Sequence, residues 1–223
     1  MKKTILMAGI ATSLFAFNAN ALDFTPYVSV KATYTDFDTD LTWYNTWDNG
    51  ESKYNETYDI SDKSWGGSIA LGSSIQLYHS SIRTELEYNK KADIESSFSD
   101  FIGDTYKTKI ETQSFMFNAY YDINTGTNFT PYIGGGVGCA QIKAQDQYWS
   151  EFYGDIKDTV FSWQVGAGIS YSINDNFVVD AGYRYIDFGN LSEKQTFDND
   201  WGSEKDEFDI SANEFYLGLR YQF

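Results

Sequence analysis

Apolar and polar residues alternate along several stretches of this chain. In the segment 24–37, for example, Val28, Val30 and Ala32 alternate with Ser29 and Lys31. A period of two places successive side chains on opposite faces of a β-strand, so each stretch is expected to form a strand with one apolar and one polar face. Eight such stretches occur: 24–37, 64–77, 80–90, 109–122, 130–143, 159–173, 176–188 and 213–223.

One stretch, TPYIGGGVGCAQIK at 130–143, does not reveal which of its residues share a face, because glycines fill many of its positions. Glycine inside a strand allows tight bends and close packing. The run GGGVG is not followed by a helical pattern, so it does not indicate a nucleotide-binding loop.

The expected connections alternate in length. Strict alternation of short turns and long loops, with both chain ends on the short-turn side, is typical of an outer-membrane barrel. The expected fold class is therefore all-β, an eight-stranded antiparallel up-and-down transmembrane β-barrel, closed so that no strand edge is unpaired in lipid. Short turns are expected near 77–81, 122–130 and 172–176, and long polar loops near 38–63, 90–108, 144–158 and 189–211.

A soluble sandwich or a lipocalin-like barrel would alternate in the same way. Two features favour the membrane barrel instead. The polar row combines glycine, serine and charged residues, which suits a crowded lumen. Aromatic residues also recur near the ends of the apolar rows, where membrane interfaces favour them: Tyr34, Trp65, Tyr88, Phe161, Tyr171, Phe177, Tyr185 and Phe223.

The N-terminal segment MKKTILMAGIATSLFAFNANA predicts export. It has Lys2 and Lys3, a short apolar run, and the sequence Ala19-Asn20-Ala21. This order is that of a secretory signal peptide, with cleavage expected after Ala21. Residues 1–21 are thus expected to be removed, and residues 22–223 to form one outer-membrane barrel domain.

Composition agrees with this interpretation and excludes one partner. Aromatic residues make up 18% of the chain, yet the mean hydropathy is -0.45. This combination fits strands that alternate rather than apolar helices. The formal charge of -16 makes nucleic acid a poor partner, because phosphates are bound by clustered lysine and arginine. With Cys139 as the sole cysteine, no internal disulfide can form.

Four segments resemble a known family: FTPYVSVKATY (24–34), TPYIGGGVGCA (130–140), FVVDAGYRYIDFG (177–189) and FYLGLRYQF (215–223). They are similar to the small outer-membrane barrels of the opacity-type surface antigen group, related to the OmpA-like transmembrane domain. The resemblance implies that the terminal Phe223 is a signal for the barrel-assembly machinery, and that no peptidoglycan-binding domain follows it. It does not fix an activity, because the group includes adhesins, protective antigens and proteins without an assigned role.

The polar rows supply charged residues to the expected lumen. An eight-stranded barrel has room inside for little more than side chains, and buried charges must pair. We expect a packed ion-pair plug, in which Glu214 and Arg220 meet Arg184, Asp180 or Lys31. The alternative is a gated ion path, as in a small low-conductance porin. The candidates are Lys31, Arg83, Glu85, Glu87, Asp180, Arg184, Glu214 and Arg220.

Enzymatic activity is not expected, and no cofactor or metal site is predicted. His79, the single histidine, precedes Ser80 and Ser81, which superficially resembles a lipid A deacylase. However, the layout places His79 in a periplasmic turn, away from an outer-leaflet substrate. A lipid-modifying enzyme is therefore the remote alternative. The acidic segment 198–209 has many oxygen ligands, but its spacing does not match an EF-hand.

The long connections combine carboxylates with aromatic residues, which can act as binding anchors. We therefore expect a surface protein that acts through its external loops in adhesion, ligand binding or envelope integrity. The alternative is that these aromatics only touch lipid headgroups or the barrel rim. Expected partners are outer-membrane lipid and lipopolysaccharide, the assembly machinery and an extracellular or host ligand. The loop candidates are Trp43, Tyr44, Trp47, Trp149 and Trp201.

Overall fold

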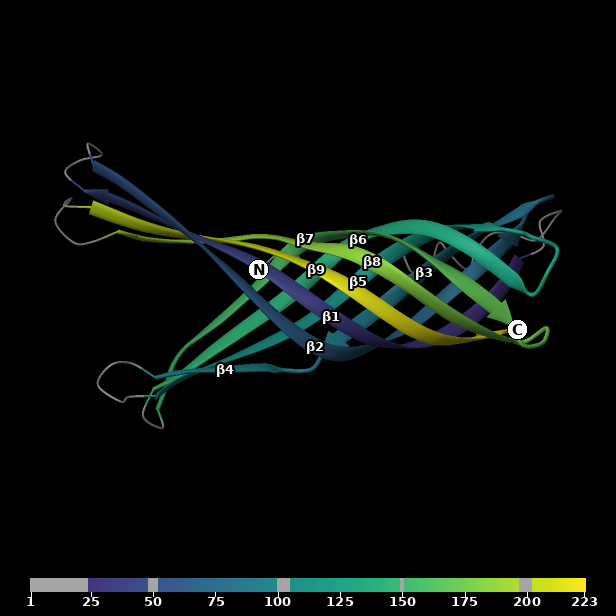
Figure 1. Ribbon diagram of the computed structural model, residues 1–223, viewed down its shortest axis with the longest axis horizontal. Coiled ribbons are helices and arrows are strands. Elements are labelled where there is room, and N and C mark those ends of the chain that lie inside the picture. Colours follow the sequence, from purple (N-terminus) through teal and green to yellow (C-terminus); the bar gives the residue numbers. More distant parts are fainter. Residues whose placement is uncertain (1–23, 48–51, 100–104, 149–150, 197–201) are drawn as a thin grey trace, which may run out of the picture.

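The described part of the chain is one β-sheet closed onto itself (Figure 1). The computed structural model describes residues 24–47, 52–99, 105–148, 151–196 and 202–223. No helix within these ranges is long and apolar enough to cross a membrane. The strands are β1 (Phe24–Trp47), β2 (Ser52–Gln76), β3 (Ser80–Lys91), β4 (Ile94–Ser99), β5 (Thr105–Ile123), β6 (Phe129–Tyr148), β7 (Glu151–Ser172), β8 (Phe177–Thr196) and β9 (Gly202–Gln222).

The sheet closes as an eight-stranded antiparallel barrel, as predicted. Its strand order is β3-β2-β1-β9-β8-β7-β6-β5-β4, and a further pairing of β3 with β5 joins the two sides. Both β3 and β4 pair with β5, and only Ala92 and Asp93 separate them in sequence. They therefore form one interrupted strand. The last strand, β9, pairs with β1 from Tyr27↔Gln222 onward, which joins the first and last strands of the sheet.

The alternation seen in the sequence matches the two faces of the sheet. On β9, Leu217 is 60% exposed and belongs to the outer row, whereas Glu214 is fully buried in the interior. On β1, Val30 is 54% exposed and the adjacent Lys31 is buried. A soluble protein would expose its polar row and bury its apolar one. The inverted arrangement is that of a barrel whose solvent is lipid.

The prediction of long loops is wrong for four segments: 38–63, 90–108, 144–158 and 189–211. Most of their described residues continue the strands. The β1–β2 ladder, for instance, runs without a break from Phe24↔Ile75 to Trp47↔Ser52. Backbone pairing requires no apolar face, so a hairpin can continue into water once it has left the membrane. The polar composition of these segments therefore indicates where the strands leave the membrane, and not where the strands end.

Beyond the apolar band the sheet divides into two arms (Figure 1). The ladder between β2 and β3 ends at Gly66↔Lys91, and that between β7 and β8 at Trp163↔Asp187. The first arm, residues 40–61 and 190–208 where described, continues β2, β1, β9 and β8. The second arm, residues 94–110 and 144–157 where described, continues β4, β5, β6 and β7.

A bulge marks the start of the first arm on β8. The β8–β9 register shifts between Asp187 and Asn190. Gly189 lies there with a φ of 76°, a conformation that glycine adopts without steric cost. Its backbone N–H donates to Asp187 Oδ1 at 2.7 Å. The extra residue lets β8 bend away from β7 while it stays paired with β9.

The structure assigns the faces of strand β6, which the sequence left open. Gly134, Gly136 and Gly138 face the lumen, where they stand opposite Tyr120, Asn118 and Met116 of β5. A Cβ added at Gly134 would lie 2.9 Å from Cγ of Tyr120. The absence of side chains at these glycines therefore leaves room for the large side chains of β5. The alternate residues Ile133 and Val137 face lipid.

Candidate functional site

The barrel interior contains ten buried charged side chains among the described residues. Five are cationic and five anionic, so the interior is neutral as a whole. Burying a charge without a partner is costly, and this balance makes full pairing feasible. The ten are Lys31, Arg83, Lys91, Arg184, Arg220, Glu85, Glu87, Asp122, Asp180 and Glu214.

Six of these charges form a continuous chain of alternating sign in the middle of the barrel. Lys31 Nζ lies 2.6 Å from Glu85 Oε1 and 3.4 Å from Glu87 Oε2. Arg184 reaches Glu87 Oε2 with Nη1 at 2.8 Å and donates from Nε to Glu214 Oε1 at 2.7 Å. Glu214 also pairs with Lys91. The order is Glu85, Lys31, Glu87, Arg184, Glu214 and Lys91.

Neutral side chains add hydrogen bonds to this central chain. Thr35 donates its hydroxyl to Glu214 Oε2 at 2.6 Å, and Tyr120 donates to Glu85 Oε1 at 2.9 Å. Asn118 Nδ2 donates to Glu87 Oε2 at 2.8 Å. Oε1 of Glu87 has no hydrogen-bond partner, so the buried network is extensively but not fully satisfied.

Two further ion pairs lie toward the short-turn end. Arg83 Nε donates to both carboxylate oxygens of Asp122, at 2.9 and 2.7 Å. Arg220 Nη2 lies 3.2 Å from Asp180 Oδ1. Tyrosine rings separate these pairs from the central chain. The Arg83 guanidinium lies 4.8 Å from the ring centre of Tyr132, close enough for a cation–π interaction.

An apolar layer lies inside the barrel on the side of the arms. Phe37 of β1 and Phe188 of β8 stack with ring centres 5.8 Å apart. Ala140, Ile186 and Ala212 complete the cluster, and all five side chains are buried. The described interior therefore combines a charge chain with an apolar cluster on its arm side.

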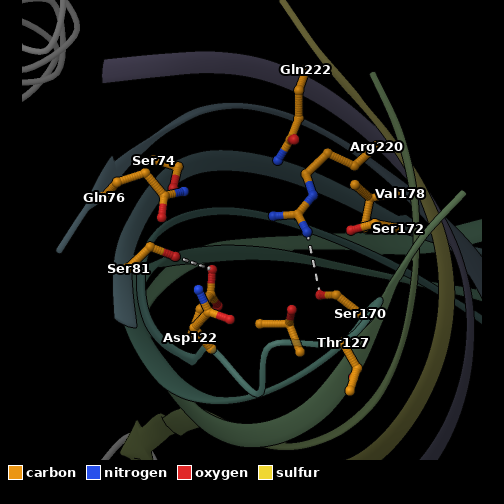
Figure 2. Close-up of a pocket in the computed structure, with 12 residues that line it drawn as sticks. Ser74, Gln76, Ser81, Asp122, Thr127, Ser170, Ser172, Val178, Arg220 and Gln222 are labelled. Carbon is orange, nitrogen blue, oxygen red and sulfur yellow. Dashed lines mark hydrogen bonds between the residues drawn. The ribbon is translucent and has the colours of Figure 1, made fainter. Parts of the chain in front are cut away.

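The short-turn end is hollow. A cavity of about 250 Å³ lies there, and its walls are almost entirely polar (Figure 2). Serine, threonine and amide side chains from several strands surround it, together with Asp122 and Arg220. This cavity has room for a small molecule.

The structure places all eight predicted lumen residues in the interior. Glu214 meets Arg184, and Arg220 meets Asp180, as expected. Lys31 of β1 instead pairs with Glu85 of β3, because the inward-facing side chains of the intervening strand β2 are small. They are Ser68, Ala70 and Gly72.

Sequence reasoning missed Lys91 and Asp122. The parity of Arg83, Glu85 and Glu87 continues to Lys91, one residue past the predicted end of that strand. Asp122 likewise follows the parity of Asn118 on β5. Alternation alone could have found both residues, since Lys91 needs the strand at 80–90 to be one residue longer and Asp122 already lies within the stretch 109–122.

Of the remaining candidates, His79 and Phe223 lie outside the interior, whereas Ser81 faces it. His79 is exposed in the turn before β3, where its ring contacts that of Tyr78 at 4.2 Å. Ser81 donates its hydroxyl to Asp122, so it is engaged in the lumen. Phe223 is exposed, and its N–H donates to the carbonyl of Pro26 at 3.0 Å.

The loop candidates fall at or beyond the limits of what the structure describes. The backbones of Trp43, Tyr44 and Trp47 belong to β1, but their side chains lie outside the described part. Trp149 and Trp201 lie outside the described residues altogether, as does the predicted signal peptide at 1–21. Among the described side chains, no group of three or more His, Cys, Asp or Glu could hold a metal ion.

Comparisons with known proteins agree with this architecture. Outer membrane protein PagN of Salmonella typhimurium is 30% identical over 175 residues, covering 71% of this chain and 73% of PagN. Opacity protein V28 of Neisseria gonorrhoeae is 24% identical over 131 residues, covering 48% of this chain and 50% of V28. The structure of OprG from Pseudomonas aeruginosa matches with a TM-score of 0.50 at 12% identity, over 89% of this chain and 96% of OprG.

The family assignment rests on most of the chain. Residues 4–223 match the sequence model of the outer membrane protein beta-barrel domain. The closed barrel with its lipid-facing apolar rows fits the same location, so the protein resides in the outer membrane, as predicted. The chain belongs to the outer membrane protein beta-barrel family.

Proposed function

We propose that this protein is a non-enzymatic surface protein that binds an extracellular ligand through its two arms. The observation that carries the proposal is the contrast between the two regions of the barrel. The membrane part is filled by a neutral ion-pair chain and an apolar layer, whereas four strands on each side continue past it. Elements held rigidly on a scaffold are where barrels of this kind display function.

The composition of the arms indicates the chemistry of the ligand. Residues 40–61 combine Asp40, Asp48, Glu51, Glu56 and Asp59 with three tyrosines and two tryptophans. Carboxylates attract cationic groups, and aromatic rings bind them through their faces. The proposed ligand is therefore a basic segment of a host or matrix protein, with Trp43, Tyr44, Trp47, Trp149 and Trp201 as anchors.

The register of the arms allows a clean test. Leu41 pairs with Tyr58, and Leu191 pairs with Phe208. Replacing 42–57 or 192–207 by Asn-Gly would therefore shorten the first arm and leave its ladder in register, because Asn-Gly favours a two-residue hairpin turn. Bacteria producing the shortened protein are expected to bind cultured host cells about tenfold less, as expected when aromatic anchors are lost.

Two controls make this result interpretable. Heat-modifiable mobility on gels should show that the shortened barrels still fold. Trp163→Ala removes a tryptophan that is exposed on the outer row, so it should leave cell binding unchanged. Undiminished binding after both truncations of the first arm would overturn the assignment of Trp43, Tyr44, Trp47 and Trp201 as anchors.

Catalysis and conduction are the alternatives. The remote alternative of a lipid-modifying enzyme would require His79, and His79→Ala should leave the lipid A profile of producing cells unchanged. The porin alternative rests on one feature of the central chain: Arg184 contacts two carboxylates, Glu87 and Glu214. Exchange of such partners could open a path, which is tested below.

A further inference from the structure

The cavity at the short-turn end is lined by polar groups that have no part in the ligand binding proposed for the arms. It occupies about 250 Å³ between the turns and the ion pairs of Arg83 and Arg220. A water molecule takes up about 30 Å³ of liquid, so the space exceeds what one or two waters would fill. Figure 2 shows Arg220 reaching into it from β9, opposite Ser81 and Asp122.

Arg220 brings hydrogen-bond donors that lack partners. The residue is 3% exposed, and its Nη2 donates to Ser170 Oγ at 3.3 Å and to Asp180 Oδ1 at 3.2 Å. Its Nε and Nη1 have no hydrogen-bond partner. In Figure 2 one terminal nitrogen meets Ser170, and the other points across the cavity. Buried donors of a cation are rarely left unsatisfied, so these nitrogens indicate a missing acceptor.

The carboxylates nearby are already engaged. Both oxygens of Asp122 accept from Arg83 Nε, and Oδ2 also accepts from Ser81 at 3.1 Å. Asp180 Oδ1 accepts from Ser170 at 2.6 Å as well as from Arg220. What remains for a ligand is a set of donors, namely the free N–H groups of Arg220 and the hydroxyl of Ser74.

We propose that this cavity binds a small oxyanion that enters from the periplasmic side, with Arg220 as its principal donor. Phosphate and carboxylate groups share the required chemistry, because both present several acceptor oxygens to a guanidinium. Two sources can supply it, free inorganic phosphate or the terminal carboxylate of a short peptide. The site lies at the end of the barrel opposite the arms, and it is independent of ligand binding by the arms.

Titration of the folded barrel in zwitterionic detergent micelles tests the site. Inorganic phosphate, followed by phosphorus NMR, and a dipeptide with a free carboxyl terminus, followed by calorimetry, are the two probes. The same dipeptide with an amidated terminus is the control ligand. We expect saturable binding of phosphate or of the free dipeptide, and none of the amide. Which probe binds identifies the source.

Three variants locate the binding. Arg220→Lys keeps the charge opposite Asp180 but removes most of the donor geometry. Ser74→Leu fills the cavity without removing a charged group. Each is expected to weaken binding about tenfold, the scale of a lost charge-assisted hydrogen bond. Ala119→Leu adds the same side chain on the exposed outer row and should bind as the unmodified protein does.

Two outcomes would overturn the proposal. If neither probe binds saturably to a barrel that keeps its heat-modifiable mobility, the cavity holds water only. If Ser74→Leu binds as well as the unmodified protein, the anion sits elsewhere on the surface. Since Ser74→Leu removes no charged group, its result does not depend on whether Arg220→Lys folds.

Discussion

Arg184 and Glu87 form an ion pair that spans the lumen. Their strands, β8 and β3, lie four places apart in either direction around the barrel, so the pair joins opposite walls. The Nη1 of Arg184 nevertheless lies 2.8 Å from Oε2 of Glu87. This contact crosses the full diameter of the barrel and ties the two halves of the sheet together.

Removing one partner of this pair should destabilise the barrel strongly. Arg184→Gln leaves the central chain with one uncompensated negative charge, which is expected to lower the free energy of unfolding by about 3–5 kcal/mol. The double variant Arg184→Gln/Glu87→Gln restores neutrality and should recover part of the loss. Urea unfolding in lipid vesicles, followed by tryptophan fluorescence, measures both. Equal midpoints for the single variant and the unmodified protein would contradict the assigned network.

The closed interior predicts that the protein does not conduct ions. In planar lipid bilayers the purified barrel should give no discrete conductance steps, because both the charge chain and the Phe37–Phe188 layer block the path. Phe37→Ala/Phe188→Ala should remain silent as well, since the charge chain is still in place. Regular steps from the unmodified protein would instead support the small-porin alternative.

The lumenal glycines of β6 should not tolerate side chains. Gly134→Ala would place a methyl group against Tyr120, and overpacking of this kind costs about 1–3 kcal/mol. Ile133→Val, at the adjacent exposed position, should cost less because no interior atom has to move. Unfolding midpoints of the two variants provide the comparison. A larger loss for Ile133→Val would mean that the faces of β6 are reversed.

The outer row should respond to charge as a lipid-facing surface does. Leu217 lies midway along the exposed row of β9. Leu217→Arg is therefore expected to lower the free energy of unfolding in vesicles by about 2–4 kcal/mol. Asn128→Arg, in the exposed turn before β6, is the matched control and should have little effect. Tolerance of arginine at both positions would argue that the outer row does not face lipid.

Period-two alternation carried the fold prediction because a strand fixes which side chains share a face. Residues such as Val30 and Lys31, or Leu217 and Glu214, therefore predicted directly which side chains face lipid and which face the lumen. Alternation failed on β6, where Gly134 and its neighbours carry no side chain to reveal a face. It also failed at the arms, because backbone ladders extend through polar sequence without leaving a hydrophobic signature.

The sequence by itself determined the barrel, its eight strands and the inward direction of the charged residues, because these follow from local periodicity. Its place in the outer membrane was predicted from features beyond alternation, such as the aromatic residues near the ends of the apolar rows. Only the tertiary structure decided which charges meet. Arg184 reaches Glu87 across the lumen, and Lys31 reaches Glu85 past the small side chains of β2. The cavity below Arg220 likewise depends on closure of the sheet. These contacts join residues far apart in the chain, and their distances are set by barrel diameter and register, which no local pattern encodes.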